Sequence, residues 1–438
     1  MALRLPSRFL RPIRATAALL PVLVGLALLP APALRAQDAP GVRLGLKYVA
    51  GEKKALIVLP IAGTRGDSLA LMLSRDFTNS DRFSVVSTSA APPVNGSPNY
   101  PLFSKLGVDG IVQVTILPSG WARVALHDVG LKVVKNTRDF PLPAPVLSPA
   151  WRMAVHGIAD AAEEWITGQR GIAQTRIAFT RGGRIYTVDS DGANVTAVTP
   201  SGMSPQWLPT GRGIVYHVLD GVRNPIMYTD LVTGAQRTIA SAPGVEHSSA
   251  AVSPDGRTVV YARGTESGTD LYAQPLEGGP ARRITVGRGR ASTQPSFSPD
   301  GQRLTYMSDR SGHPEVYISD VDGANVDLLT SGSFGDNDYR SGPDWSPDGR
   351  LVAFSSRNNK TFQIMTINLR DQTTRIVTTD GRNEDPSWAP DSRHLVFTST
   401  KSGTRQLWIV DTESGATRQL TFGPEARLAA WSPRLLSQ

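Results

Sequence analysis

The stretch Ser298–Thr330, SPDGQRLTYMSDRSGHPEVYISDVDGANVDLLT, determines the fold of most of this chain. It contains three short runs in which apolar and polar residues alternate, and a fourth run, Gln294–Phe297, precedes it. Such alternation is typical of a strand with one buried face. Turns rich in Asp and Gly separate the runs, and these residues favour tight hairpins because they tolerate positive φ. The stretch therefore predicts a four-stranded antiparallel meander.

The same pattern recurs through the C-terminal part of the chain. A turn proline follows the first strand of each unit, at intervals of about 45 residues. These prolines are Pro209, Pro254, Pro299, Pro347, Pro390 and Pro433. One four-stranded sheet cannot cover both of its own faces, so sheets of this kind must stack on one another. The repeat thus indicates a stacked array of similar sheets.

The two ends of the array complement each other. Its first copy begins at Arg176–Phe179, which matches the second strand of a unit, and its last copy, Leu428–Pro433, matches only a first strand. A closed ring in which the C-terminal strand completes the first sheet removes the exposed edges of an open stack. We therefore predict a six-bladed all-β propeller over residues 170–438. An open β-solenoid is the alternative.

Residues 51–169 predict a small mixed α/β domain. The apolar run Ala55–Ile61 suits a buried strand, and the apolar residues of Leu69–Phe77 recur at helical spacing. Ser148 can cap a helix that ends at Gly168, with proline at its first position. Gly63–Gly66 lacks the lysine and the spacing of a phosphate-binding loop. The fold class is therefore two-domain, a small mixed α/β N-terminal domain followed by a propeller closed by the C-terminal strand.

The N-terminus has the features of a secretory leader. An arginine-rich start precedes the apolar segment Ala15–Leu29, and small residues would allow cleavage after Ala33 or Ala36. We predict a signal peptide over residues 1–36 and a short N-terminal arm over residues 37–50. An uncleaved membrane anchor is the alternative for the leader, and an edge strand or frayed terminus for the arm.

Charge and composition exclude several classes of function. The leader carries five arginines and no acid, so most of the formal charge of +8 belongs to it. Nucleic-acid binding therefore loses its main support. The chain contains no cysteine, which excludes disulfides and thiolate metal sites.

The sequence contains no recognisable catalytic constellation. It has no G-x-S-x-G motif, and its six histidines form no H-x-H or H-x-x-x-H pair. Asp189-x-Asp191-Gly192 and Asp320-x-Asp322-Gly323 look like parts of a calcium loop, but the glutamate at the twelfth position is absent and both fall at an expected hairpin turn. We predict no catalytic residue, no metal site and no cofactor.

A propeller without catalytic groups is most often a binding platform that uses its channel mouth and inter-blade loops. Four loops lead into the expected inner strands: Glu246–Ser249, Ala291–Gln294, Asp336–Arg340 and Arg382–Asp385. They are polar and differ from one another. Within this rim the candidate partner-binding residues include Asp338, Tyr339, Asn383 and Glu384. A merely solvated edge is the alternative.

The order of these features resembles one known family. A leader, a small α/β domain, six W-S-P-D-G-type repeats and the closing Ala430–Pro433 together resemble the TolB family of the Tol-Pal system. Ile166–Phe179 is similar to the family's domain junction, and Ser308–Tyr317 is similar to its common blade core.

This resemblance implies a non-enzymatic, monomeric periplasmic protein that supports outer-membrane integrity, protein import and constriction during cell division. It implies binding of a Pal-like lipoprotein at the propeller mouth, with His247, Ala250 and Thr293 as contacts. It also implies binding of a TolA-like inner-membrane protein through the N-terminal arm. The arm residues are Val42, Arg43, Leu44 and Gly45.

Two other classes of function remain open at this level. An accessory periplasmic propeller could bind a peptide or glycan, or support a hydrolase encoded nearby, and gene neighbourhood would distinguish it. A metal-dependent enzyme in the channel would need acidic or histidine side chains that converge inward.

Overall fold

The computed structural model describes residues 52–63, 66–87, 96–287, 289–330, 339–358 and 361–435. All of them belong to one compact unit. The predicted signal peptide, the arm residues Val42, Arg43, Leu44 and Gly45, and the rim residue Asp338 lie outside these ranges. No helix within the ranges is both long and apolar enough to cross a bilayer.

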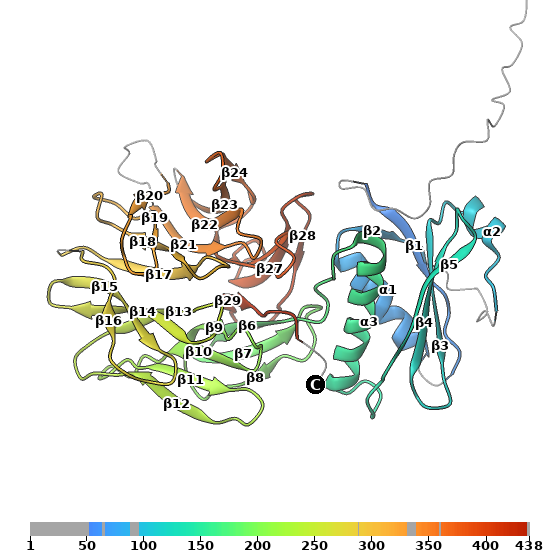
Figure 1. The fold of residues 1–438 in the computed structure, drawn as a ribbon, viewed down its shortest axis with the longest axis horizontal. Coiled ribbons are helices and arrows are strands. Elements are labelled where there is room, and N and C mark those ends of the chain that lie inside the picture. The colour runs from blue at the N-terminus through green and yellow to red at the C-terminus, as the bar shows by residue number, and fades with distance from the viewer. Residues whose placement is uncertain are drawn as a thin grey trace, which may run out of the picture. The chain divides into compact units, whose positions relative to one another are not determined.

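The N-terminal part is a five-stranded sheet with the order β2-β1-β3-β4-β5 (Figure 1). Its strands are β1 (Lys54–Val58), β2 (Phe83–Val85), β3 (Gly110–Ile116), β4 (Ala122–Asp128) and β5 (Val133–Phe140). Strand β1 runs parallel to β2 and β3, and the remaining pairs are antiparallel. The sheet is therefore mixed, and together with its helices it forms the small mixed α/β domain that was predicted.

Helices cover both faces of this sheet. Helices α1 (Gly66–Asn79) and α3 (Pro149–Thr167) pack their apolar sides on the face that carries Leu56 and Val112. Helix α2 (Tyr100–Lys105) places Phe103 on the opposite face, with Ile57 and Ile111. Neighbouring residues of one strand point to opposite faces, which is why the two cores alternate along β1 and β3.

The predicted boundaries of α3 are confirmed. The Ser148 hydroxyl accepts a hydrogen bond from the Trp151 amide at 3.2 Å, and Pro149 is the first helical residue. Gly168 ends the helix with φ 76°, a conformation that costs glycine little.

The C-terminal part is a ring of six four-stranded antiparallel blades (Figure 1). Blade 1 consists of β29 (Arg427–Trp431), β6 (Arg176–Arg181), β7 (Arg184–Asp189) and β8 (Thr196–Ala197). Blade 2 consists of β9 (Met203–Trp207), β10 (Gly213–His217), β11 (Ile226–Asp230) and β12 (Gln236–Ala240). Blade 3 consists of β13 (His247–Val252), β14 (Thr258–Thr265), β15 (Gly268–Pro275) and β16 (Arg282–Arg283).

The other three blades repeat this order. Blade 4 consists of β17 (Ser292–Phe297), β18 (Arg303–Ser308), β19 (Glu315–Asp320) and β20 (Asp327–Leu328). Blade 5 consists of β21 (Tyr339–Trp345), β22 (Leu351–Asn358), β23 (Thr361–Asn368) and β24 (Thr374–Ile376). Blade 6 consists of β25 (Asn383–Trp388), β26 (His394–Ser399), β27 (Gln406–Asp411) and β28 (Thr417–Gln419).

The C-terminal strand closes the ring as predicted. Strand β29 pairs antiparallel with β6, with Trp431 opposite Ile177. The buried Trp431 indole donates to the Thr175 hydroxyl at 2.8 Å. Closure thus joins residues from the two ends of the propeller in one blade.

The S-P-D-G copies form tight turns between strands. In the blade 4 copy the Ser298 hydroxyl donates to the Asp300 carboxylate and accepts from the Arg303 amide at 2.9 Å. Gly301 follows with φ 70°. The turn interpretation of these aspartates is confirmed.

One repeated feature was not evident from the sequence. Each inner strand contains a bulge at which one residue takes φ between 50° and 57°. These residues are Ser204, Ser249, Gln294, Gly342, Asp385 and Leu428. A bulge re-aims the side chains around it. The six bulges therefore shape the wall of the central channel.

Candidate binding site at the propeller mouth

The six inner strands surround a central cavity of about 260 Å³. Its wall includes Gln206, Gln294, Asp344 and Asp385, together with the bulge residues of each strand. This volume is small for a protein partner, so such a partner would bind across the mouth.

Asp344 ties neighbouring inner strands together. Its carboxylate accepts hydrogen bonds from the Ser296 hydroxyl at 3.1 Å and from the Trp388 amide at 2.7 Å. It therefore joins blades 4, 5 and 6. Burial raises the pKa of Asp344 to about 6, although the two hydrogen bonds oppose the shift. Burial and the nearby Glu384 likewise raise the pKa of Asp385 to about 6.

The structure brings the predicted rim residues to one end of the ring. His247, Ser292, Tyr339 and Asn383 begin the inner strands of blades 3 to 6. The inner strands run side by side around the channel, so their first residues share one mouth. The clustering expected for these loops is therefore present in the described part of the chain.

The candidate residues differ in how far a partner could reach them. His247 is 2% exposed, Ala250 4% and Asn383 1%, whereas Thr293, Tyr339 and Glu384 are partly exposed. Contact of these residues with a partner stays a prediction. The buried ones would take part only by shaping the rim or after the loops move.

Local contacts explain why His247 and Asn383 are buried. His247 packs its ring 5.7 Å from that of Tyr261, and burial lowers its pKa. The Asn383 amide donates to Gln363 Oε1 at 2.7 Å and to the Asp380 carbonyl at 3.0 Å. Both side chains therefore hold the start of an inner strand in place.

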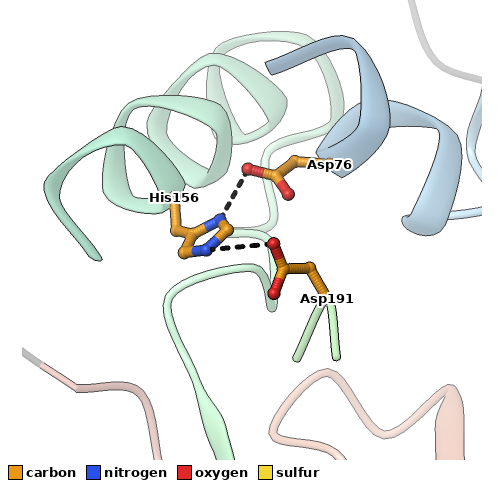
Figure 2. A group of neighbouring side chains, drawn as sticks. All are labelled: Asp76, His156 and Asp191. Carbon is orange, nitrogen blue, oxygen red and sulfur yellow. Dashed lines mark hydrogen bonds and ion pairs between the residues drawn. The ribbon is translucent and has the colours of Figure 1, made fainter. Parts of the chain in front are cut away.

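A second set of polar residues links the propeller to the helices of the N-terminal part. His156 of α3 lies between Asp76 of α1 and Asp191, in the turn after β7 (Figure 2). His156 Nδ1 is 2.7 Å from Asp76 Oδ2, and its Nε2 is 3.7 Å from Asp191 Oδ2. Burial opposes the charged imidazole, but the two carboxylates raise the pKa of His156 above its ordinary value.

A similar arrangement surrounds His394 in blade 6. Its Nδ1 is 2.7 Å from Asp391 Oδ2, and its Nε2 is 3.5 Å from Asp81 Oδ2, just after α1. Burial again opposes protonation, but the charge and hydrogen bond of Asp391 dominate and raise the pKa of His394 to about 9. The imidazolium therefore bridges a propeller carboxylate and one from the N-terminal part.

The two clusters have ligand atoms close enough to hold a metal ion, but carboxylates in both are already paired with arginines. In Asp76, His156 and Asp191, and in Asp81, His394 and Asp411, the potential ligand atoms lie within 4.8 Å of one another. Arginines already pair with them: Arg75 and Arg152 contact Asp191, and Arg393 contacts Asp411. The clusters are therefore best described as ion-pair bridges, and neither lies in the channel.

Comparison with known proteins agrees with this architecture. The family model described as TolB beta propeller domain matches residues 163–435, which is more than half of the chain. The chain belongs to the TolB β-propeller family.

TolB proteins also appear among the individual relatives. The Tol-Pal system protein TolB of Methylococcus capsulatus is 32% identical over 204 residues, which cover 43% of this chain and 48% of that protein. The chain thus spans about half the length of the curated relatives it matches. The crystal structure of TolB from Acinetobacter baumannii superposes with a TM-score of 0.76 at 22% identity and covers 89% of this chain and 98% of that chain. This likeness concerns the fold.

The propeller architecture is not restricted to TolB. Hydrazine synthase from Kuenenia stuttgartiensis has a TM-score of 0.50 at 13% identity and covers 60% of this chain and 48% of that chain. The propeller alone therefore does not decide between a binding protein and an enzyme.

The ion-pair bridges of this TolB-family chain escaped the sequence analysis. Asp76, His156 and Asp191 are far apart in the sequence, so no spacing motif joins them. Asp191 was interpreted as a turn residue, and it does lie in a turn, where its carboxylate accepts from the Ala193 amide at 3.0 Å. The only local signal was a histidine on an apolar helix, between Val155 and Ile158.

Proposed function

We propose that this TolB-family chain is a non-enzymatic protein-binding component of the Tol-Pal cell-envelope system, located in the periplasm. The observation that carries the proposal is the family match across the whole propeller, residues 163–435. The N-terminal leader supports export, and the polar mouth supports a binding role. No step of the proposal requires catalysis.

The partner at the mouth is a Pal-like lipoprotein. Thr293, Tyr339 and Glu384 are the predicted contacts that are already partly exposed. His247 and Ala250 act behind them, because both side chains are buried in the rim. A TolA-like inner-membrane protein binds the arm residues Val42, Arg43, Leu44 and Gly45. Through these two partners the protein supports outer-membrane integrity and constriction at division.

Calorimetric titration with the periplasmic domain of the cognate lipoprotein tests the proposal. Thr293→Arg places a long side chain at the mouth, and we expect binding at least about 10-fold weaker than wild type. Gln302→Arg is the matched control, because this exposed residue lies in the S-P-D-G turn at the opposite end of blade 4. The control should bind as wild type does.

Deleting residues 37–46 should abolish binding of the TolA-like protein and spare the lipoprotein. A wild-type protein that binds neither partner would contradict the proposal and favour the accessory propeller that binds peptide or glycan. Equal weakening by Thr293→Arg and Gln302→Arg would remove the mouth from the binding site.

A further inference from the structure

Several blades place an arginine or lysine over an aromatic ring at the mouth. The Arg181 guanidinium lies 5.1 Å from the Phe179 ring centroid and 5.7 Å from that of Tyr186. Arg263 lies 5.1 Å from Tyr272. These contacts occur in blades 1 and 3.

Blades 4 and 6 repeat the arrangement. Arg310 lies 5.6 Å from the Tyr306 ring centroid and 4.9 Å from that of Tyr317. The Lys401 ammonium lies 5.2 Å from the Trp408 ring. The recurrence in different blades shows that this is not a single chance contact, although similar contacts also lie away from the mouth, such as Arg303 over Trp345.

The aromatic partners occupy one position of the blade. Tyr186, Tyr272, Tyr317 and Trp408 lie on the third strand, opposite the aromatic residue of the second strand. Methionine takes this place in blades 2 and 5, as Met227 and Met365, and in blade 5 Arg357 instead covers Tyr339 and Phe362. The arrangement therefore occurs in the four blades that carry the aromatic pair.

Strand register places these cations at the mouth with the rim loops. Arg263 pairs with His247, the first residue of the inner strand of blade 3. Thr180, the neighbour of Arg181, pairs with Arg427, the first residue of β29. Arg310 follows Ser308, which pairs with Ser292 at the start of β17. All three arginines therefore surround the end of the channel where the inner strands begin.

Arg181, Arg263 and Arg310, here called the seated arginines, form no ion pair with a carboxylate among the residues that the structure describes. Other cations of the same rim do: Arg340 pairs with Glu315, Arg382 with Glu384 and Arg405 with Glu425. The seated arginines are partly exposed, and the Nε–H groups of Arg181 and Arg263 are buried without a hydrogen-bond partner in the described ranges.

A guanidinium held on an aromatic face is well suited to bind a carboxylate. Its planar fork donates two parallel hydrogen bonds to both oxygens, and it is the most common partner for such recognition. The ring contact holds the long side chain in place, so less conformational entropy is lost when a ligand binds. We propose that the seated arginines bind carboxylate groups on an acidic surface of the protein partner at the mouth.

This proposal rests on the proposed function, since it names the chemistry of the partner at the same mouth. The structural alternative is that each arginine only covers apolar surface of its blade with its aliphatic stem. The dependence of partner binding on charge and ionic strength distinguishes the two roles, because a contact made by the stem does not depend on salt.

The test measures association of the mature chain with the periplasmic domain of its cognate lipoprotein at several salt concentrations. Arg181→Gln, Arg263→Gln and Arg310→Gln should each weaken binding by about 3- to 10-fold. The triple variant should also lose most of the salt dependence of the association rate. Arg303→Gln is the matched control: Arg303 lies 5.1 Å from the Trp345 ring, but at the opposite end of blade 4.

A substitution of opposite sign completes the test. Glu266 is an exposed acid in the hairpin between β14 and β15, four residues before Asp270, which lies opposite Arg263. Glu266→Gln should raise the association rate with an acidic partner by about 2-fold.

Each outcome decides between the alternatives. A triple variant that binds the lipoprotein as wild type does, with the same salt dependence, overturns the assignment and leaves the proposed function in place. A wild-type protein that does not bind the lipoprotein overturns both. If the triple variant loses binding to isolated peptidoglycan sacculi but not to the lipoprotein, the arginines serve an anionic glycan and the protein assignment is wrong.

Discussion

The charge on His394 should make the stability of this protein depend on pH in the alkaline range. The folded structure raises the pKa of this imidazole from its ordinary 6.5 to about 9, mainly because Asp391 opposes the effect of burial. A raised histidine pKa contributes stability that is complete below the unfolded pKa. That stability is lost as pH rises through the folded pKa. The relevant window therefore lies between pH 7 and pH 10.

The magnitude follows from the two pKa values. A shift of this size corresponds to a stabilisation of about 2–3 kcal/mol at pH 7 and almost none at pH 10. The pair needs no correction for solvent screening, because His394 is 0% exposed. The pKa of Asp391 is held well below its usual range, so this carboxylate stays charged throughout the window. Asp81 and Asp411 face the imidazole as well, and Arg82 and Arg393 lie on the flanking carboxylates.

The assay is urea unfolding, followed by tryptophan fluorescence, at pH values from 6 to 10. We expect His394→Asn to be less stable than wild type by about 2–4 kcal/mol at pH 7, because buried carboxylates lose their partner. The difference between the two proteins should narrow by about 2–3 kcal/mol at pH 10. Groups that titrate in this range away from His394 affect both proteins and cancel in the comparison. Glu163 does not cancel, because burial raises its pKa to about 8 and the charge of His394 lowers it.

His217→Asn provides the control. Burial lowers the pKa of His217 to about 4, so this histidine is neutral across the whole range. Its stability difference from wild type should therefore not vary between pH 6 and pH 10. If the difference between wild type and His394→Asn is as large at pH 10 as at pH 7, His394 is not charged in the folded protein and the reasoning fails.

Two further predictions concern contacts that hold the ring together. Asp344→Ala should lower the free energy of unfolding by about 1–3 kcal/mol, because the Trp388 amide and the Ser296 hydroxyl lose their acceptor. Asp344→Asn keeps one acceptor oxygen, so it should lower this free energy less. Midpoints of urea unfolding measure both changes. Trp431→Ala should lower the free energy of unfolding by about 3–5 kcal/mol, because it leaves a cavity where β29 pairs with β6. An unchanged thermal midpoint for Trp431→Ala would show that the last strand does not stabilise blade 1.

Much of the fold could be predicted from local sequence pattern. Counting the expected second strands, from Ile177 to Leu395, indicated six blades, and the partial copies at Arg176 and Leu428 indicated closure by the last strand. Ser148 and Gly168 marked both ends of α3. These features could be recognised because turns, caps and alternation depend on a few neighbouring residues.

The candidate site was only partly accessible to this reasoning. The loops that contain His247 and Asn383 were expected at the mouth and lie there, but the burial of these two side chains depends on Tyr261 and Gln363 in other strands. The bulges of the inner strands were also missed, since only Gly342 among the six left-handed positions is a glycine. Residues such as Ser249 adopt positive φ because the pairing of the whole blade compensates for the local strain.

The sequence by itself determined the class of each element, the number of blades and the way the ring closes, because these properties repeat or end at recognisable residues. Only the tertiary structure decided which charges meet. Asp76, His156 and Asp191 come together from two helices and a blade turn, and each seated arginine meets an aromatic ring on the adjacent strand or a nearby one. The ion pairs join residues distant in the chain, whereas the arginine–ring contacts are local and depend on strand pairing. The energies of both depend on burial and neighbouring charge, which no local pattern encodes.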